Sequence, residues 1–316
     1  MITQKGVVVD YDRMILATGS KPFIPPIPGS DLKGVISFRD IYDVNTMLEY
    51  CKNKKNAVVI GGGLLGLEAA YGLKQRGMNV TVLHLMDRIM DRQLDSRASA
   101  MLKQSIENKG IKIITEANTE ALIGQDGHVN QVRLKDGTVL DADLVVFAVG
   151  IRPNITLAQS AGLRCNRGIL VNDTMQTFDP SIYAVGECIE HRNQTFGLVE
   201  PLWGQAFICA THLAEHGSLT FKSPTVPTQL KVSGVDVFSA GNFEPKEDYE
   251  DIILNDEKRH IYKRIIIQKD KVIGAVLFGD TEDGMWYAEL IADQTPVSTF
   301  RNKLLFGKDF ALKKAG

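Results

Sequence analysis

Two patterns of apolar residues alternate along the chain, and together they predict an α/β fold. Short, almost wholly apolar runs bounded by glycine or polar residues are typical of parallel strands buried on both faces. Between these runs, apolar residues recur every three or four positions, as they do on one face of a helix. The strands are expected at 57–60, 80–83, 111–115 and 144–149, and the helices at 39–52 and 93–109.

The stretch 117–141 shows a third pattern. It is divided by the turn dipeptides Asp126-Gly127 and Asp136-Gly137, which favour tight β-hairpins. A three-stranded meander is therefore expected before the strand at 144–149.

The N-terminal part predicts a pair of strands joined by a tight turn at 7–16, followed by the proline-rich stretch 21–29. Fixed φ angles and few free donors suit that stretch to a linker between domains. The elements expected after residue 151 are a strand near 168–172, a short apolar strand just before Gly186, a turn at 201–203 and a helix at 204–216.

From about residue 221 the pattern changes to short β segments and a final helix near 285–293. That order is typical of a separate small α+β domain. Its strands are expected at 228–232, 235–240, 259–268 and 271–279.

A glycine fingerprint stands between the strand 57–60 and an apolar-periodic helix. In a dinucleotide-binding βαβ unit, Gly61 would allow the tight turn, Gly63 would let the backbone approach a pyrophosphate, and Gly66 would let the helix pack close to the sheet. The pyrophosphate would lie at the helix N-terminus. A glycine-rich turn without a ligand is the alternative interpretation.

The fingerprint departs from its usual form at the end of the second strand. An acidic residue normally holds the ribose 2′-hydroxyl there, but this sequence has His84, with Arg88 four residues later. Neither residue would repel a 2′-phosphate, so NADPH is compatible with the site and even favoured. The alternative is that both residues are solvated loop residues.

Composition narrows the class of protein. A length of 316 residues suggests about two domains, and a net charge of −2 gives no electrostatic footprint for nucleic acid. No apolar stretch is long enough for a membrane span or a signal peptide, so a soluble, cytoplasmic protein without membrane or nucleic-acid partners is expected. The cysteines are too far apart for a redox pair or an iron–sulfur cluster, and no metal site is expected; they are Cys51, Cys165, Cys188 and Cys209.

Four motifs, ATGS with its IPG linker, GGGLLGLE, AVGIRPN and FDPSIYAVGE, occur in this order. The order resembles the pyridine-nucleotide-dependent flavoprotein reductases that have two dinucleotide-binding domains. More narrowly, residues 91–95, 186–206 and 230–241 are similar to the large subunit of NAD(P)H nitrite reductases. The resemblance covers essentially the whole chain.

The resemblance implies FAD and NAD(P)H as cofactors and assigns residues to the flavin. Ala17, Thr18 and Gly19 would lie where the chain crosses the FAD. Gly186 and Glu187 would hold the ribityl chain, with Glu187 in place of the usual Asp. The residues expected to flank the isoalloxazine are Glu200, Pro201 and Trp203. The helix that follows them would point its positive end at the flavin, which favours the anionic reduced form.

On the nicotinamide side, the resemblance implies that Glu68 faces the carboxamide as the catalytic-site residue and that Gly150 closes over the ring. Glu68 could also be a solvated helix charge that suits the dipole. The implied fold is a Rossmann-like NAD(P)-binding domain inserted in a partial FAD-binding domain, followed by the small C-terminal domain. The expected boundaries are 1–30 and 152–220 for the FAD-binding segments, 31–151 for the NAD(P)-binding domain and 221–316 for the C-terminal domain.

Two features of the family are not found in the sequence: the first GxGxxG, which binds the ADP half of FAD, and the iron–sulfur and sirohaem domains. We therefore expect an internal portion of a larger reductase or a truncated gene product. Its function would be electron input from NAD(P)H through flavin to an iron–sulfur or sirohaem acceptor. The alternatives are a rubredoxin- or ferredoxin-type reductase and a non-catalytic nucleotide-binding fragment without stable FAD. The sequence also allows a homo-oligomer.

Overall fold

The computed structural model describes residues 1–215, 217, 219–223, 227–230, 234–244 and 248–312. Its contacts divide the chain into two compact units. The small unit comprises Met1–Pro22 and Gly150–Pro224, and the large unit comprises Phe23–Val149 and Thr225–Gly316. The sequence-based domain boundaries stay a prediction.

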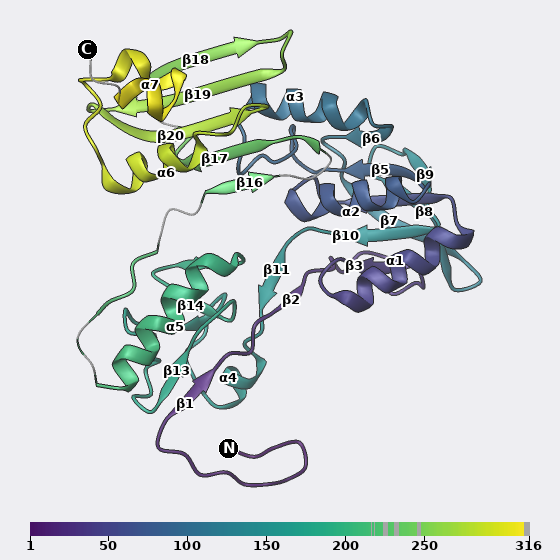
Figure 1. Cartoon of the computed structure of the whole chain (residues 1–316). Helices are drawn as coiled ribbons and strands as arrows, with labels where there is room; N and C mark the ends of the chain where they lie inside the picture. The colour runs from purple at the N-terminus through teal and green to yellow at the C-terminus, as the bar shows by residue number, and fades with distance from the viewer. Residues whose placement is uncertain (216, 218, 224–226, 231–233, 245–247, 313–316) are drawn as a thin grey trace. The chain divides into compact units, whose positions relative to one another are not determined.

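The centre of the large unit is a five-stranded parallel sheet with the order β3-β10-β4-β5-β6. The predicted apolar runs form its three inner strands and the edge strand β6. All four residues of β10 are buried, because a parallel sheet is covered on both faces. The elements are β3 (Val35–Ser37), α1 (Ile41–Asn53), β4 (Asn56–Ile60), α2 (Leu64–Gln75), β5 (Asn79–Leu83), α3 (Ser96–Glu107), β6 (Ile111–Ile114) and β10 (Leu144–Phe147) (Figure 1).

Helix α3 begins three residues later than its apolar period suggests. Asp95 is its N-cap, and the Asp95 carboxylate accepts a 2.9 Å hydrogen bond from the backbone N–H of Ala98. Aspartate at this position satisfies one of the unpaired donors of the first turn. The helix therefore starts at Ser96 and not at residue 93.

The predicted meander is present. Strands β7 (Thr119–Gln125), β8 (His128–Leu134) and β9 (Val139–Asp141) form a three-stranded antiparallel sheet. Asp126 and Gly127 have φ angles of 52° and 76° in the first turn, as a type I′ hairpin requires.

The C-terminal part of the large unit is a five-stranded antiparallel sheet with the order β16-β17-β20-β19-β18. Strand β18 was not expected from the sequence, because it lies at the sheet edge and its residues alternate between exposed and half-buried. The elements are β16 (Thr228–Leu230), β17 (Val237–Gly241), β18 (Glu250–Asp256), β19 (Ile261–Gln268), β20 (Lys271–Phe278), α6 (Gly284–Asp293), the 3₁₀ helix η2 (Arg301–Phe306) and α7 (Lys308–Leu312).

This second sheet shares a core with the parallel sheet. Val276 and Phe278 of β20 pack in one cluster with Leu102 and Ile106 of α3, and α3 lies beside β20 in Figure 1. Helix α3 therefore packs between the two sheets of the large unit and joins their cores.

The small unit contains short sheets around one long helix. Strand β1 pairs with β13 in parallel, and β2 pairs with β11 in antiparallel. The elements are β1 (Met14–Leu16), β2 (Ser20–Pro22), β11 (Ile151–Pro153), α4 (Thr156–Ser160), β12 (Ile169–Leu170), β13 (Ile182–Ala184), β14 (Ile189–His191), β15 (Gln194–Thr195) and α5 (Val199–Leu213).

Two sequence-based predictions in this unit are wrong. The expected strand pair at 7–16 is reduced to β1, and Ile2 and Val8 form only an isolated bridge. Helix α5 begins at Val199, so the expected turn at 201–203 is already helical. Pro201 was interpreted as a turn residue, but it lies in the first turn of α5. The N–H groups of a first turn have no partner within the helix, so proline is tolerated there.

Candidate functional site

The glycine loop of the large unit follows β4 and leads into α2. The sheet order reverses here, since β5 and β6 lie on one side of β4 and β10 lies on the other. Ligands of doubly wound sheets bind at the carboxyl ends of the strands that flank such a switch point. The fold thus places the fingerprint at the position where ligands of doubly wound sheets bind.

Each fingerprint glycine has its own structural reason. Gly61 has a φ of +122°, and a Cβ there would lie 2.3 Å from the carbonyl oxygen of Ala148. A Cβ on Gly66 would lie 1.9 Å from the carbonyl oxygen of Gly61. These two glycines are therefore required by the packing of loop, helix and sheet.

Gly63 differs from the other two. A Cβ built on it would meet no atom within 4 Å, and Gly63 is the N-cap of α2 without a side-chain hydrogen bond to the helix. The space beside Gly63 and the N–H groups of the first turn suit a phosphate. The loop therefore fits the pyrophosphate of a dinucleotide.

His84 is held within the loop by both ring nitrogens. Its Nδ1 accepts a 3.0 Å hydrogen bond from the N–H of Gly62, and its Nε2 lies 3.0 Å from Oδ1 of Asp91. The His84 side chain is only 12% exposed. Gly62 and Asp91 were missed by sequence reasoning; the signal for Asp91 was its place in the DRQLD motif.

Arg88 is engaged at the edge of the same loop. Its guanidinium pairs with Glu244, just after β17, and more weakly with Asp87 at 3.5 Å. His84 and Arg88 are thus tied into internal contacts rather than freely solvated, and their predicted role at the coenzyme 2′ position stays a prediction.

Glu68 lies on α2 and is half-buried. Burial raises the pKa of its carboxyl group, which brings proton exchange closer to neutral pH. Gly150, the other residue expected at the nicotinamide, has a φ of +99° and open space where a Cβ would stand. Both roles stay predictions.

In the small unit, the two segments expected at the flavin come together. Strands β1 and β13 are parallel neighbours, so Ala17–Gly19 and Gly186–Glu187 leave the same edge of the sheet. The hydroxyl of Ser20 donates a 2.7 Å hydrogen bond to Oε2 of Glu187. The Thr18 hydroxyl donates to the carbonyl oxygen of Asn154 at 2.6 Å.

Gln205 links this edge to α5. Its Oε1 accepts a 2.7 Å hydrogen bond from the N–H of Gly186, and its buried Nε2 has no hydrogen-bond partner among the described residues. An unsatisfied buried donor costs free energy, and a ligand carbonyl or hydroxyl beside Gly186 would satisfy it. The residues here therefore fit a polar chain such as that of a flavin. Gln205 was missed, although a polar residue on the buried face of an apolar helix is a visible signal.

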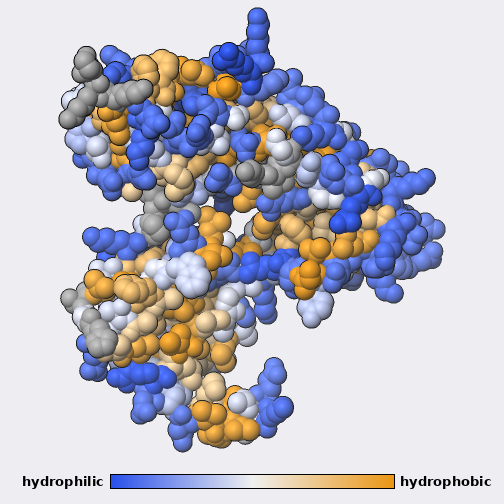
Figure 2. All heavy atoms as spheres, in the orientation of Figure 1, coloured by the Kyte–Doolittle hydropathy of each residue, from blue (hydrophilic) through white to orange (hydrophobic). Residues whose placement is uncertain are grey.

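The three residues expected at the isoalloxazine stand in the first turns of α5 in different surroundings. Pro201 is buried and Glu200 is exposed, whereas Trp203 is 74% exposed and Phe207, one turn later, is 64% exposed. Figure 2 shows apolar surface over the part of the small unit where α5 lies.

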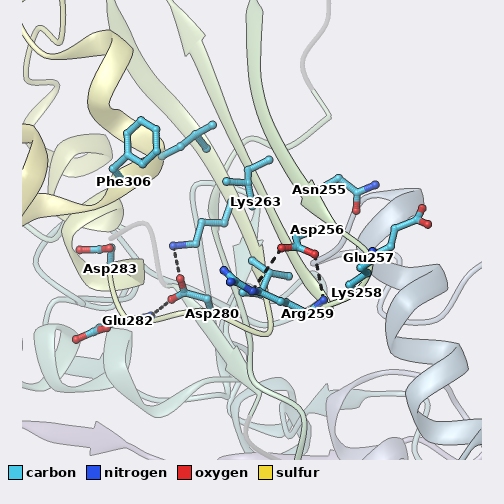
Figure 3. A pocket seen from close by; sticks show the side chains of 13 residues that line it. Asn255, Asp256, Glu257, Lys258, Arg259, Lys263, Asp280, Glu282, Asp283 and Phe306 are labelled. Atoms are coloured by element: carbon cyan, nitrogen blue, oxygen red, sulfur yellow. Dashed lines mark hydrogen bonds and ion pairs between the residues drawn. The ribbon is translucent and has the colours of Figure 1, made fainter.

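The large unit also has a pocket of about 790 Å³ beside β18, β19 and η2. Figure 3 shows Lys263 directed at Asp280 in it, with Nζ 2.7 Å from Oδ2. The Lys263 side chain is buried, so this pair fixes the sheet to the following loop. Among the described residues, no cluster of three or more metal-ligating side chains is found, and no helix has the length and hydropathy that crossing a bilayer would need.

The family model for pyridine nucleotide-disulphide oxidoreductases matches residues 2–206. The chain belongs to this family. The model for the rubredoxin NAD⁺ reductase C-terminal domain matches residues 227–295. At the level of the family, the predicted α/β class with a small C-terminal domain is confirmed, and so is the predicted membership in a family of pyridine-nucleotide-dependent flavoprotein oxidoreductases. The activity of this chain itself stays a prediction.

Individual relatives agree with this membership. Nitrite reductase [NAD(P)H] of Bacillus subtilis (strain 168) is 50% identical over 298 residues, which are 94% of this chain and 37% of that protein. The NAD-dependent persulfide reductase of A. fulgidus is 28% identical with a TM-score of 0.86, over 95% of this chain and 60% of that chain. NADH:rubredoxin oxidoreductase from Clostridium acetobutylicum is 26% identical with a TM-score of 0.77, over 96% and 76% of the two chains. The chain thus spans well under half the length of the nitrite reductase.

Proposed function

We propose that this chain is the electron-input part of an NAD(P)H-dependent nitrite reductase, in which electrons pass from NAD(P)H through FAD to an iron–sulfur or sirohaem acceptor. The observation that carries the proposal is 50% identity to a nitrite reductase over nearly the whole chain. The open glycine loop of the large unit and the Gly186–Gln205 edge of the small unit support it. When bound, FAD would supply the chemistry that links hydride transfer to single-electron transfer, and the residues of this chain would hold and orient it.

The chain's own residues would place the two cofactors. Gly63 and the first turn of α2 would receive the coenzyme pyrophosphate. Glu68 would stand at the carboxamide of the nicotinamide. Gly186, Glu187 and Gln205 would hold the ribityl chain with their hydrogen-bonding groups.

A rubredoxin- or ferredoxin-type reductase is the second candidate. The match of residues 227–295 to the rubredoxin NAD⁺ reductase C-terminal domain favours it. The two candidates share the NAD(P)H and flavin sites and differ in the acceptor. A non-catalytic nucleotide-binding module is the third.

The test uses the natural protein that carries this chain. Bound flavin per polypeptide is measured by absorbance. Oxidation of NADH and of NADPH is then measured with ferricyanide, nitrite or oxidised rubredoxin as the electron acceptor. Stoichiometric flavin with nitrite-dependent oxidation supports the first candidate. Oxidation with rubredoxin alone supports the second, and a colourless protein supports the third.

Gly63→Val ties the activity to the glycine loop. A branched side chain would fill the space beside the N-terminus of α2, so coenzyme binding should be lost while flavin stays bound. Gly77→Asn is the matched control, because Gly77 also faces open space but follows α2 at its other end. Unchanged coenzyme affinity in a folded Gly63→Val protein would contradict the proposal.

A further inference from the structure

The ribose carboxylate of an NADH site normally ends the second strand of the βαβ unit. In this chain β5 ends at Leu83, and the next residue is His84. We propose that Asp91 supplies the missing carboxylate from the following turn, so that it binds the ribose 2′-hydroxyl of NADH and rejects the 2′-phosphate of NADPH. The inference rests on the proposed function, which gives this loop a nicotinamide dinucleotide.

The His84 ring is oriented from both sides. Because the N–H of Gly62 donates to Nδ1, that nitrogen must act as an acceptor, and the proton of the neutral ring lies on Nε2. The Nε2–H then donates to Oδ1 of Asp91. Both ring nitrogens of His84 are thus engaged within the protein and not directed at a ligand.

Gly62 makes this contact of ring and loop feasible. A Cβ on Gly62 would lie 2.9 Å from both Cγ of His84 and Cγ2 of Ile89. The lack of a side chain at Gly62 therefore lets the ring lie against the glycine loop.

The turn that carries Asp91 is fastened to the same loop. The N–H of Met90 donates a 2.9 Å hydrogen bond to the carbonyl oxygen of Gly62, and Met90 has a φ of +52°, which folds the chain back. Asp91 is thereby held at the carboxyl ends of β4 and β5. The adenosine ribose of a dinucleotide lies at these strand ends when its pyrophosphate is at the first turn of α2.

One oxygen of Asp91 is left for a ligand. Oδ1 is taken by His84, whereas no hydrogen bond to Oδ2 is found among the residues that the structure describes. The Asp91 side chain is 25% exposed. A carboxylate oxygen accepts from a ribose hydroxyl and repels a phosphate dianion.

The neighbouring charges act in the same direction. Arg88 is paired with Glu244 and Asp87. Two carboxylates thus neutralise the Arg88 guanidinium. The surroundings disfavour an added phosphate.

The test is a calorimetric titration of wild-type protein and Asp91→Asn with NADH and NADPH, repeated with ADP-ribose and its 2′-phosphate. Asparagine keeps an oxygen for the Nε2–H of His84, so the loop is retained, and an unchanged thermal midpoint checks this. The wild type should prefer NADH. The ratio of the two dissociation constants should move toward NADPH by about tenfold or more in Asp91→Asn, since one negative charge near the phosphate is removed.

Asp87→Asn is the matched control, because it removes the same charge from the same loop at a carboxylate that does not contact His84. Its ratio should change less than about threefold. Coenzyme binding with an unchanged ratio in Asp91→Asn, or an equal shift in both variants, would overturn this inference alone. A wild-type protein that binds neither coenzyme would overturn the proposed function and the inference with it.

Discussion

The hydroxyl of Tyr262 donates a 2.8 Å hydrogen bond to the carboxylate of Asp95, which joins β19 to the segment that caps α3. Arg264 adds a second contact to the same oxygen at 3.2 Å. Burial and the neighbouring carboxylate raise the pKa of the Tyr262 phenol, so the hydroxyl stays protonated and donates. The cap of α3 and the C-terminal sheet therefore depend on one another.

Tyr262→Phe tests this dependence. The variant removes one donor from a buried carboxylate, and we expect the free energy of unfolding of the large unit to fall by about 1–3 kcal/mol. Urea unfolding followed by circular dichroism measures it. Tyr42→Phe on the exposed face of α1 is the control and should change stability by less than about 0.5 kcal/mol. Equal stability of the two variants would show that the Asp95 contact contributes nothing.

The glycine loop gives a second prediction, which concerns the stability of the fold. Gly66→Ala places a Cβ 1.9 Å from the Gly61 carbonyl oxygen, so the turn or the helix must shift, and we expect a loss of several kcal/mol or no folded protein. Gly63→Ala meets no atom within 4 Å and should fold normally. Thermal unfolding of the pair measures the difference, and a Gly66→Ala protein as stable as Gly63→Ala would refute the packing role of Gly66.

The sequence was sufficient where one local pattern decides the structure. The apolar runs of β4, β5 and β10 and the Asp-Gly turns of the meander each specify their element without help from distant residues. It failed where a partner far along the chain decides. Strand β18 carries the mixed pattern of a sheet edge, and only its pairing with β19 makes it a strand.

The candidate site shows the same division. The three fingerprint glycines could be predicted, because their spacing between an apolar strand and an apolar-periodic helix is visible in the sequence. The contacts of His84 with Gly62 and Asp91 could not, since the residue type is compatible with a solvated loop and only the fold brings both partners to the ring. Gln205 likewise meets Gly186 only after α5 packs on the small unit.

Asp173 gives a prediction on pH. Hydrogen bonds from Arg192 and His191 lower the pKa of its carboxyl group to about 2. A folded-state pKa below the unfolded value adds stability that is present above about pH 4 and is lost as the pH falls toward 2. Because about a third of the side chain is exposed (34%), solvent screening limits the effect to about 1 kcal/mol.

The measurement compares wild-type protein with Asp173→Asn by thermal unfolding between pH 2 and pH 6. The wild type should be the more stable protein at pH 6, and its advantage should shrink below pH 4. Asp179→Asn serves as the reference for removing an acidic side chain of the same unit. An advantage of the wild type that is constant from pH 6 to pH 2 would contradict the depressed pKa.

The pairing of Arg88 with Glu244 gives the last prediction. Glu244→Gln removes the carboxylate that neutralises the Arg88 guanidinium, which then becomes available to a 2′-phosphate. We expect NADPH to bind several-fold more tightly and NADH to be little affected, since only NADPH carries that phosphate. Glu257→Gln is the matched control. Glu257 also forms an ion pair with an arginine, but this arginine, Arg97, lies on α3 and not in the glycine loop. Calorimetric titration with both coenzymes decides it: equal changes for NADH and NADPH in Glu244→Gln, or the same response in Glu257→Gln, would mean that Arg88 does not face the 2′ position.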